Sequence, residues 1–193
     1  MLNNVSKYNI ILASNSPRRK ELLAGLGLNF TVKTIADIDE SYPEHLKGSE
    51  IAEHISLKKA KAYEKILSNN DLIITADTIV WNENKVLGKP KDRQDAIKMI
   101  RALSGKTHIV YTAVSITTTE WQKSFTTASE VLFDNLTDDE IEYYVDHYKP
   151  FDKAGAYGIQ EWIGYIAVKS IKGSFYNIMG LPVQRLYTEL KSI

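Results

Sequence analysis

The most constraining feature of this chain is a strand pattern that passes through a short polar loop into a helix pattern. Tyr8–Ala13 is an apolar run typical of a buried strand, and "SNSPRR" at Ser14–Arg19 follows it directly. Lys20–Leu26 then has the spacing of a helix that ends at Gly27. The succession predicts a loop held between a buried strand and a helix N-terminus.

The loop has the chemistry of an anion site. Ser16 is suited to cap the helix, and Pro17 suits its first position. Free backbone N–H groups there would add to Ser14, Ser16, Arg18 and Arg19, which can all contact phosphate oxygens. The alternative is a capped surface helix with two solvated arginines.

Composition limits the classes of protein that are possible. The 193 residues hold 24 lysines plus arginines and 24 aspartates plus glutamates. This balance provides no general field for nucleic acid or an anionic membrane, so an anion site must be local. There is no cysteine, and no run approaches the roughly 20 apolar residues that span a bilayer. We expect a cytoplasmic protein with one domain over residues 1–193.

The rest of the pattern alternates between strands and helices. Strands are predicted at Asn29–Ile35, Leu72–Val80, Lys85–Leu87 and Ile166–Ile171, with a long hairpin over Thr107–Phe133. Helices are predicted at Gly48–Ser68, Asp92–Leu103, Thr137–His147 and Pro182–Leu190. The segments 36–47 and 151–163 are predicted to be loops.

Acids and cations near the ends of these elements are the candidate chemical groups. Asp77 interrupts an apolar strand, where a carboxylate is costly to bury unless it has a partner or a task. Asp39 and Glu40 lie in an acidic loop, and Lys59 and Lys89 lie on a helix and at a strand end. Carboxylates of this kind suit Mg²⁺ or Mn²⁺. The alternatives are a structural aspartate and solvated charges.

Several other chemistries lack their motifs. The four histidines have no HxH or HExxH spacing for zinc, and the chain contains neither a P-loop nor GxSxG. Metal-assisted hydrolysis of a phosphoanhydride is the reaction that remains.

Ordered motifs give a specific resemblance. "SNSPRR", "ADTIV", "LGKP", "LSGKTHIVYTAV", "DKAGAYGIQ" and "IKGSFYNIMGLPV" together resemble the Maf family of nucleoside triphosphate pyrophosphatases. The resemblance implies an α/β fold with an elongated twisted mixed β-sheet flanked by helices, and two lobes with a central cleft, similar to inosine triphosphate pyrophosphatases. It also implies metal-dependent cleavage of a nucleoside triphosphate to monophosphate and pyrophosphate, and homodimers are common in the family.

The resemblance also assigns roles to residues. "ADT" and "AYGIQ" are similar to the branch that acts on dTTP and UTP, and modified pyrimidine nucleotides are further candidate substrates. It implies Asp77 as proton acceptor. We further expect Glu40 and Asp77 to be the metal ligands. The resemblance implies that Arg18, Thr78 and Gln160 determine substrate specificity, with Tyr157 as an aromatic side chain near the base. From their chemistry, we expect the basic and hydroxyl groups to bind the phosphates: Ser14, Ser16, Arg18, Arg19, Lys59 and Lys89.

Two departures from the family pattern lie near the expected base pocket. "YKP" at Tyr148–Pro150 replaces a usual Gly-Glu pair, and Glu161 replaces a glycine. A 7-methyl-GTP pyrophosphatase is therefore one alternative. Others are a regulator of septum formation with incidental hydrolysis, a phosphatase releasing orthophosphate and, less favoured by the charge balance, a nucleic-acid-binding module.

Overall fold

In the computed structural model, which describes residues 2–193, seven strands form one mixed sheet. Its order is β2-β1-β3-β5-β6-β7, and β4 pairs with β3 outside this path. The strands are β1 (Asn9–Leu12), β2 (Thr31–Val32), β3 (Asp71–Asn82), β4 (Lys85–Leu87), β5 (Thr107–Thr117), β6 (Gln122–Phe133) and β7 (Val168–Lys172). β1 runs parallel to both β2 and β3, whereas β4 and β7 run antiparallel to β3 and β6.

Seven α-helices accompany these strands in the described part of the chain. They are α1 (Pro17–Ala24), α2 (Ser49–Tyr63), α3 (Arg93–Leu103), α4 (Asp138–Tyr148), α5 (Trp162–Ala167), α6 (Phe175–Met179) and α7 (Val183–Lys191). Short 3₁₀ turns occupy Asn3–Val5, Glu64–Ile66 and Ala154–Ala156. No helix within residues 2–193 is long and apolar enough to cross a membrane.

The chain divides into two compact units. One unit holds the residues up to Asp77 together with Thr112–Thr127 and Gly180–Ile193; the other holds Thr78–Tyr111 and Ala128–Met179. The long strands β3, β5 and β6 contribute residues to both. We call them the first and second unit and describe each by itself.

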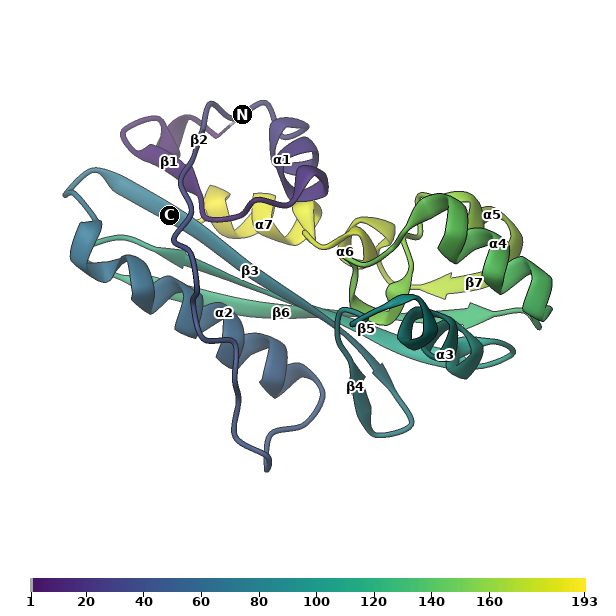
Figure 1. The fold of residues 1–193 in the computed structure, drawn as a ribbon. Helices are drawn as coiled ribbons and strands as arrows, with labels where there is room; N and C mark the ends of the chain where they lie inside the picture. The colour runs from purple at the N-terminus through teal and green to yellow at the C-terminus, as the bar shows by residue number, and fades with distance from the viewer. Residues whose placement is uncertain (1) are drawn as a thin grey trace. The chain divides into compact units, whose positions relative to one another are not determined.

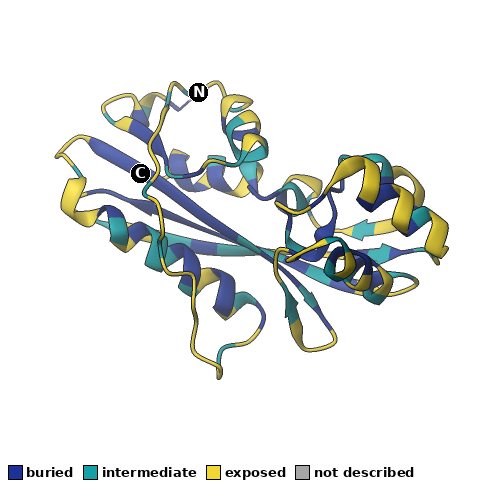
Figure 2. Ribbon diagram, in the orientation of Figure 1, coloured by how far each residue is buried: buried dark blue, intermediate teal, exposed yellow. Residues whose placement is uncertain are grey.

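The first unit is built on the parallel strands around β1. Figure 1 shows α2 on one side of its strands and α1 and α7 on the other. Leu12 on β1, Leu72 and Ile74 on β3 and Leu23 on α1 are fully buried. Figure 2 shows how continuous the burial along β3 is, which fits the largely apolar sequence of Leu72–Ala76 before Asp77.

The second unit has its own hydrophobic core, which α3 and α4 cover. Ile100 and Leu103 of α3 and Tyr144 of α4 are fully buried in one cluster. Both helices begin at side-chain caps: Asp92 accepts a hydrogen bond from the Asp95 N–H, and Thr137 forms a capping box with Glu140. The polar outer faces are exposed (Figure 2).

The predicted α/β class, with a mixed sheet flanked by helices, is confirmed. Two local predictions are wrong. Residues 162–167 form α5, although the sequence analysis predicted a loop up to residue 163 and a strand from residue 166. β2 covers only Thr31–Val32 of the predicted seven-residue strand, because this exposed edge has little apolar surface to bury.

Candidate active site

The "SNSPRR" loop has the capped geometry that its sequence predicts. Ser16 is the N-cap of α1, its Oγ accepting from the Arg19 N–H at 3.4 Å, and Pro17 is the first helical residue. Ser14 is a buried residue, and its hydroxyl accepts from the Ser16 N–H at 3.2 Å. The loop therefore presents both hydroxyl groups beside a helix N-terminus, where anions are stabilised.

Arg19 is tied into the backbone of the first unit. Its Nε donates to the Gly180 carbonyl at 2.8 Å and its Nη1 donates to the Ala76 carbonyl at 2.9 Å. Burial lowers the pKa of this guanidinium, while the nearby Asp77 charge raises it. Arg19 thus places its positive charge close to Asp77, and its two hydrogen bonds connect α1 to the backbone at Ala76 and Gly180. Arg18, its neighbour on α1, is partly buried.

Lys59 joins the two candidate acids. Its Nζ lies 2.7 Å from Asp77 Oδ1 and 2.9 Å from Glu40 Oε1. The Lys59 and Asp77 side chains are only 15% and 10% exposed, whereas that of Glu40 is 50% exposed. A helix, a strand and a loop therefore bring one ammonium and two carboxylates together.

Asp77 is electrostatically unusual. Burial raises its pKa above the ordinary value for aspartate, although the Lys59 and Arg19 charges oppose the rise. A carboxyl group whose pKa lies above its usual range is a stronger base once ionised, which is what proton abstraction near neutral pH requires.

The acidic loop is held by the lysine next to Lys59. Lys58 Nζ lies 2.6 Å from Asp39 Oδ2 and donates to the Ser41 carbonyl at 3.1 Å. These contacts hold both neighbours of Glu40 against α2. They lower the pKa of Asp39, chiefly through the Lys58 hydrogen bond. This role of Lys58 was not predicted from the sequence, in which the only signal is an acidic segment, "ADIDE", together with consecutive lysines at Lys58 and Lys59.

Glu40 and Asp77 are the carboxylates that could hold a divalent metal ion. Within residues 2–193 no three His, Cys, Asp or Glu side chains are grouped as a complete metal site. Glu40 and Asp77 supply two hard oxygen donors, which is the number that Mg²⁺ commonly takes from a protein when phosphates and water complete its shell. The donor set therefore suits a divalent ion that enters with a polyphosphate.

Three other predicted residues belong to the second unit. Thr78 on β3 is partly buried, and Lys89, just beyond β4, is exposed. Gln160 is partly buried, and its Oε1 is a buried acceptor with no hydrogen-bond partner among residues 2–193.

Tyr157 was expected to lie beside a base, but it is 5% exposed and its hydroxyl shares a hydrogen bond with His108 Nε2 at 2.8 Å. It belongs to the core.

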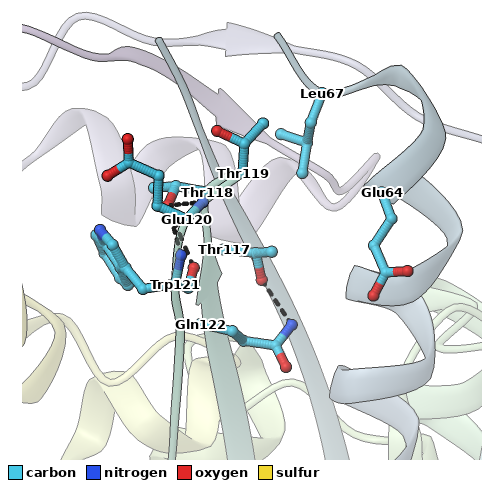
Figure 3. Close-up of a pocket in the computed structure, with 8 residues that line it drawn as sticks. All are labelled: Glu64, Leu67, Thr117, Thr118, Thr119, Glu120, Trp121 and Gln122. Carbon is cyan, nitrogen blue, oxygen red and sulfur yellow. Dashed lines mark hydrogen bonds between the residues drawn. The ribbon is translucent and has the colours of Figure 1, made fainter. Parts of the chain in front are cut away.

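A separate open pocket of about 350 Å³ lies in the first unit at the β5–β6 turn. Figure 3 shows its wall of hydroxyl, amide and carboxylate groups, including Thr118, Glu120 and Gln122. Gln122 donates to Thr117 Oγ1 at 2.9 Å, so these groups partly satisfy one another. None of the candidate site residues lines this pocket.

Comparison with known proteins first defines a class of fold. The solved structure of a HAM1 protein from Coxiella burnetii superposes with a TM-score of 0.50 at 16% identity, covering 96% of this chain and all of that chain. The likeness places this chain among α/β proteins with the HAM1 fold.

The sequence then gives the family. Residues 9–193 match the family model described as Maf-like protein, so the chain belongs to the Maf family, as its motifs predicted. A Bacteroides thetaiotaomicron protein named dTTP/UTP pyrophosphatase is 65% identical over the whole of both chains. Proteins of the same name are 59% identical in Bacteroides fragilis, again over both full lengths, and 50% identical in Porphyromonas gingivalis, over 99% of this chain and 97% of that one.

Proposed function

We propose that this protein hydrolyses dTTP and UTP to the monophosphate and pyrophosphate. The observation that carries the proposal is the buried Asp77, held by Lys59 beside Glu40, in a chain whose full-length relatives are named dTTP/UTP pyrophosphatase. The same site could accept modified pyrimidine nucleotides, which differ from dTTP and UTP only in the base.

Asp77 is the proposed general base. Water attacks the α-phosphorus, and its proton passes to the Asp77 carboxylate while the bond from the α-phosphorus to the bridging oxygen breaks. Pyrophosphate leaves with that oxygen. The raised pKa of Asp77 supports this role, and the hydrogen bond from Lys59 fixes the orientation of the carboxylate.

Cations and hydroxyl groups would hold the triphosphate. Ser14, Ser16 and Arg18 lie at the α1 N-terminus, and Lys59 adds an ammonium next to Asp77. Preorganised donors of this kind stabilise charge that develops on phosphate oxygens. Arg19 would contribute charge from its braced position, and Lys89 is a further proposed phosphate ligand.

A divalent cation, Mg²⁺ or Mn²⁺, would be held by Glu40 and Asp77. When bound, such an ion neutralises phosphate charge and orients the phosphates for attack. Lys59 contacts both carboxylates, and it would remain beside them and the bound phosphates when the cation is present.

The base would be recognised by Thr78 and Gln160, with Arg18 contributing to specificity. A glutamine side chain both donates and accepts, which suits the edge of a pyrimidine ring. The unpartnered Oε1 of Gln160 supports its use by a ligand, because a buried acceptor without a partner is costly.

A substrate panel tests the proposal. The protein is incubated with Mg²⁺ or Mn²⁺ and with dTTP, UTP, dATP, dGTP, dCTP and 7-methyl-GTP, and pyrophosphate and orthophosphate are measured separately. We expect pyrophosphate mainly from dTTP and UTP. Pyrophosphate mainly from 7-methyl-GTP would overturn the assigned specificity, orthophosphate would overturn the reaction, and binding without turnover would favour a nucleotide-dependent regulator.

A further inference from the structure

Gln160 is the third residue of a tight turn in the second unit. The turn closes where the Glu161 N–H donates to the Gly158 carbonyl at 2.9 Å. The chain then continues into α5 as the Gly164 N–H donates to the Glu161 carbonyl at 2.8 Å. Both backbone groups of Glu161 therefore link the turn to the helix that follows it.

The Glu161 side chain folds back over the same turn. The Tyr144 hydroxyl on α4 donates to Glu161 Oε2 and accepts from the Gly158 N–H at 2.9 Å. One hydroxyl thus joins the first and last residues of the turn to a buried helix position. Burial, together with this carboxylate, raises the pKa of Tyr144, so the phenol stays a donor.

A buried lysine completes the arrangement. Lys153 Nζ lies 3.1 Å from Glu161 Oε1 and 2.7 Å from Asp152 Oδ1. The Lys153 and Glu161 side chains are only 9% and 19% exposed. Both charges are therefore largely withdrawn from water, and each has a second partner: Asp152 for Lys153 and the Tyr144 hydroxyl for Glu161.

Close packing fixes where the carboxylate lies. A Cβ added at Gly158 would lie 2.7 Å from Glu161 Cδ, so any larger residue there would displace the carboxylate. A Cβ at Gly164 would lie 1.8 Å from the Ile159 carbonyl oxygen. Glycines on both sides thus allow the turn to close around Glu161, with Gln160 inside the closed segment.

We infer that Glu161 is a positioning residue for base recognition, which acts through Tyr144 and Lys153 to hold the Gly158–Glu161 turn and so to present the Gln160 amide to the pyrimidine. The inference rests on the proposed function and adds a determinant of its specificity. Its basis is a partly buried carboxylate with several partners, directly beside a residue whose own buried acceptor has no partner within residues 2–193.

Two mild variants of the full chain test this role. Glu161→Gln keeps the shape but removes the charge that Lys153 faces, and Tyr144→Phe removes the hydroxyl that joins the turn to α4. Glu142→Gln is the matched control, because Glu142 is an exposed carboxylate on α4 that pairs with Arg93. Steady-state kcat and KM are measured for dTTP, UTP and dATP.

We expect KM for dTTP and UTP to rise about tenfold in both variants, with kcat within about twofold of the wild type, because binding contacts are lost while the Asp77 chemistry is retained. The preference for dTTP over dATP should fall by a similar factor, and Glu142→Gln should behave as wild type. A purely structural role would lower kcat for every nucleotide through loss of folded protein and leave KM and the preference unchanged; that result would overturn the inference. The two proposals fail separately, because the products and the substrate preference of the wild type decide the proposed function without either variant.

Discussion

The buried Asp77 carboxylate lowers the stability of the folded protein, and its proposed role as a general base explains why it is there. Its carboxylate is mostly removed from water, and burial raises its pKa even though Lys59 and Arg19 lie close by. Folding therefore disfavours the ionised form of this side chain, and the penalty is present at every pH above its raised pKa. A residue kept only for stability would not be expected to carry such a penalty.

The substitution Asp77→Asn separates the catalytic role of this carboxylate from its effect on stability. In Asp77→Asn we expect kcat for dTTP to fall by about 10²–10⁴-fold, because the general base is lost. The thermal midpoint at pH 7 should stay the same or rise, because an uncharged amide does not carry the desolvation penalty, and Lys59 keeps Glu40 as a partner.

The matched control lies on the same strand. Asp71 is also a buried carboxylate of β3, but it accepts hydrogen bonds from the Ser68 N–H and the Asn9 amide. We expect Asp71→Asn to lower the thermal midpoint and to keep kcat. Wild-type turnover in Asp77→Asn, or a large fall in its thermal midpoint, would show that Asp77 is structural.

At the scale of elements, local sequence patterns predicted where helices begin, whereas contacts between residues far apart in the chain could not be predicted. Ser16, Asp92 and Thr137 each accept from a backbone N–H three residues ahead, so their helix starts were visible in the sequence. The helix α5 was missed because its six residues, WIGYIA, are rich in β-branched and aromatic types, and contacts with the preceding turn stabilise it.

The same distinction applies to the site. An acid within the β3 run was conspicuous, but its partner Lys59 lies 18 residues away and Glu40 lies on an exposed loop. Arg19 donates to carbonyls 57 and 161 residues further along the chain, which no local pattern could indicate. Tyr157 was misjudged because nothing in "AYGIQ" reveals that its hydroxyl meets His108 in the core.

At the scale of the whole molecule, the buried His108 in the core of the second unit should make stability depend on pH. Its Nε2 shares a hydrogen bond with the Tyr157 hydroxyl, and its ring packs edge-on against Phe133 and Tyr157. Burial lowers its pKa from 6.5 to about 4, and burial also raises the pKa of Tyr157, so both groups are neutral in the folded protein.

The direction in which stability changes with pH follows from the difference in proton binding between the folded and unfolded chain. Between pH 6.5 and about 4 the unfolded chain binds a proton at His108 and the folded chain does not, so stability falls as pH falls through this window. From pH 7 to pH 5 we expect a loss of roughly 2 kcal/mol in the free energy of unfolding, measured by urea denaturation. His108→Gln should lose most of this dependence, and the exposed His45→Gln should keep it. An equal pH dependence in all three proteins would contradict the assignment.

The central claim is that water attacks the α-phosphorus of a pyrimidine nucleoside triphosphate, and the fate of the water oxygen tests it most directly. Hydrolysis of dTTP in ¹⁸O-labelled water, followed by mass spectrometry of the products, should place one label in the monophosphate and none in pyrophosphate. Label in pyrophosphate, or labelled orthophosphate released with the diphosphate, would contradict the account.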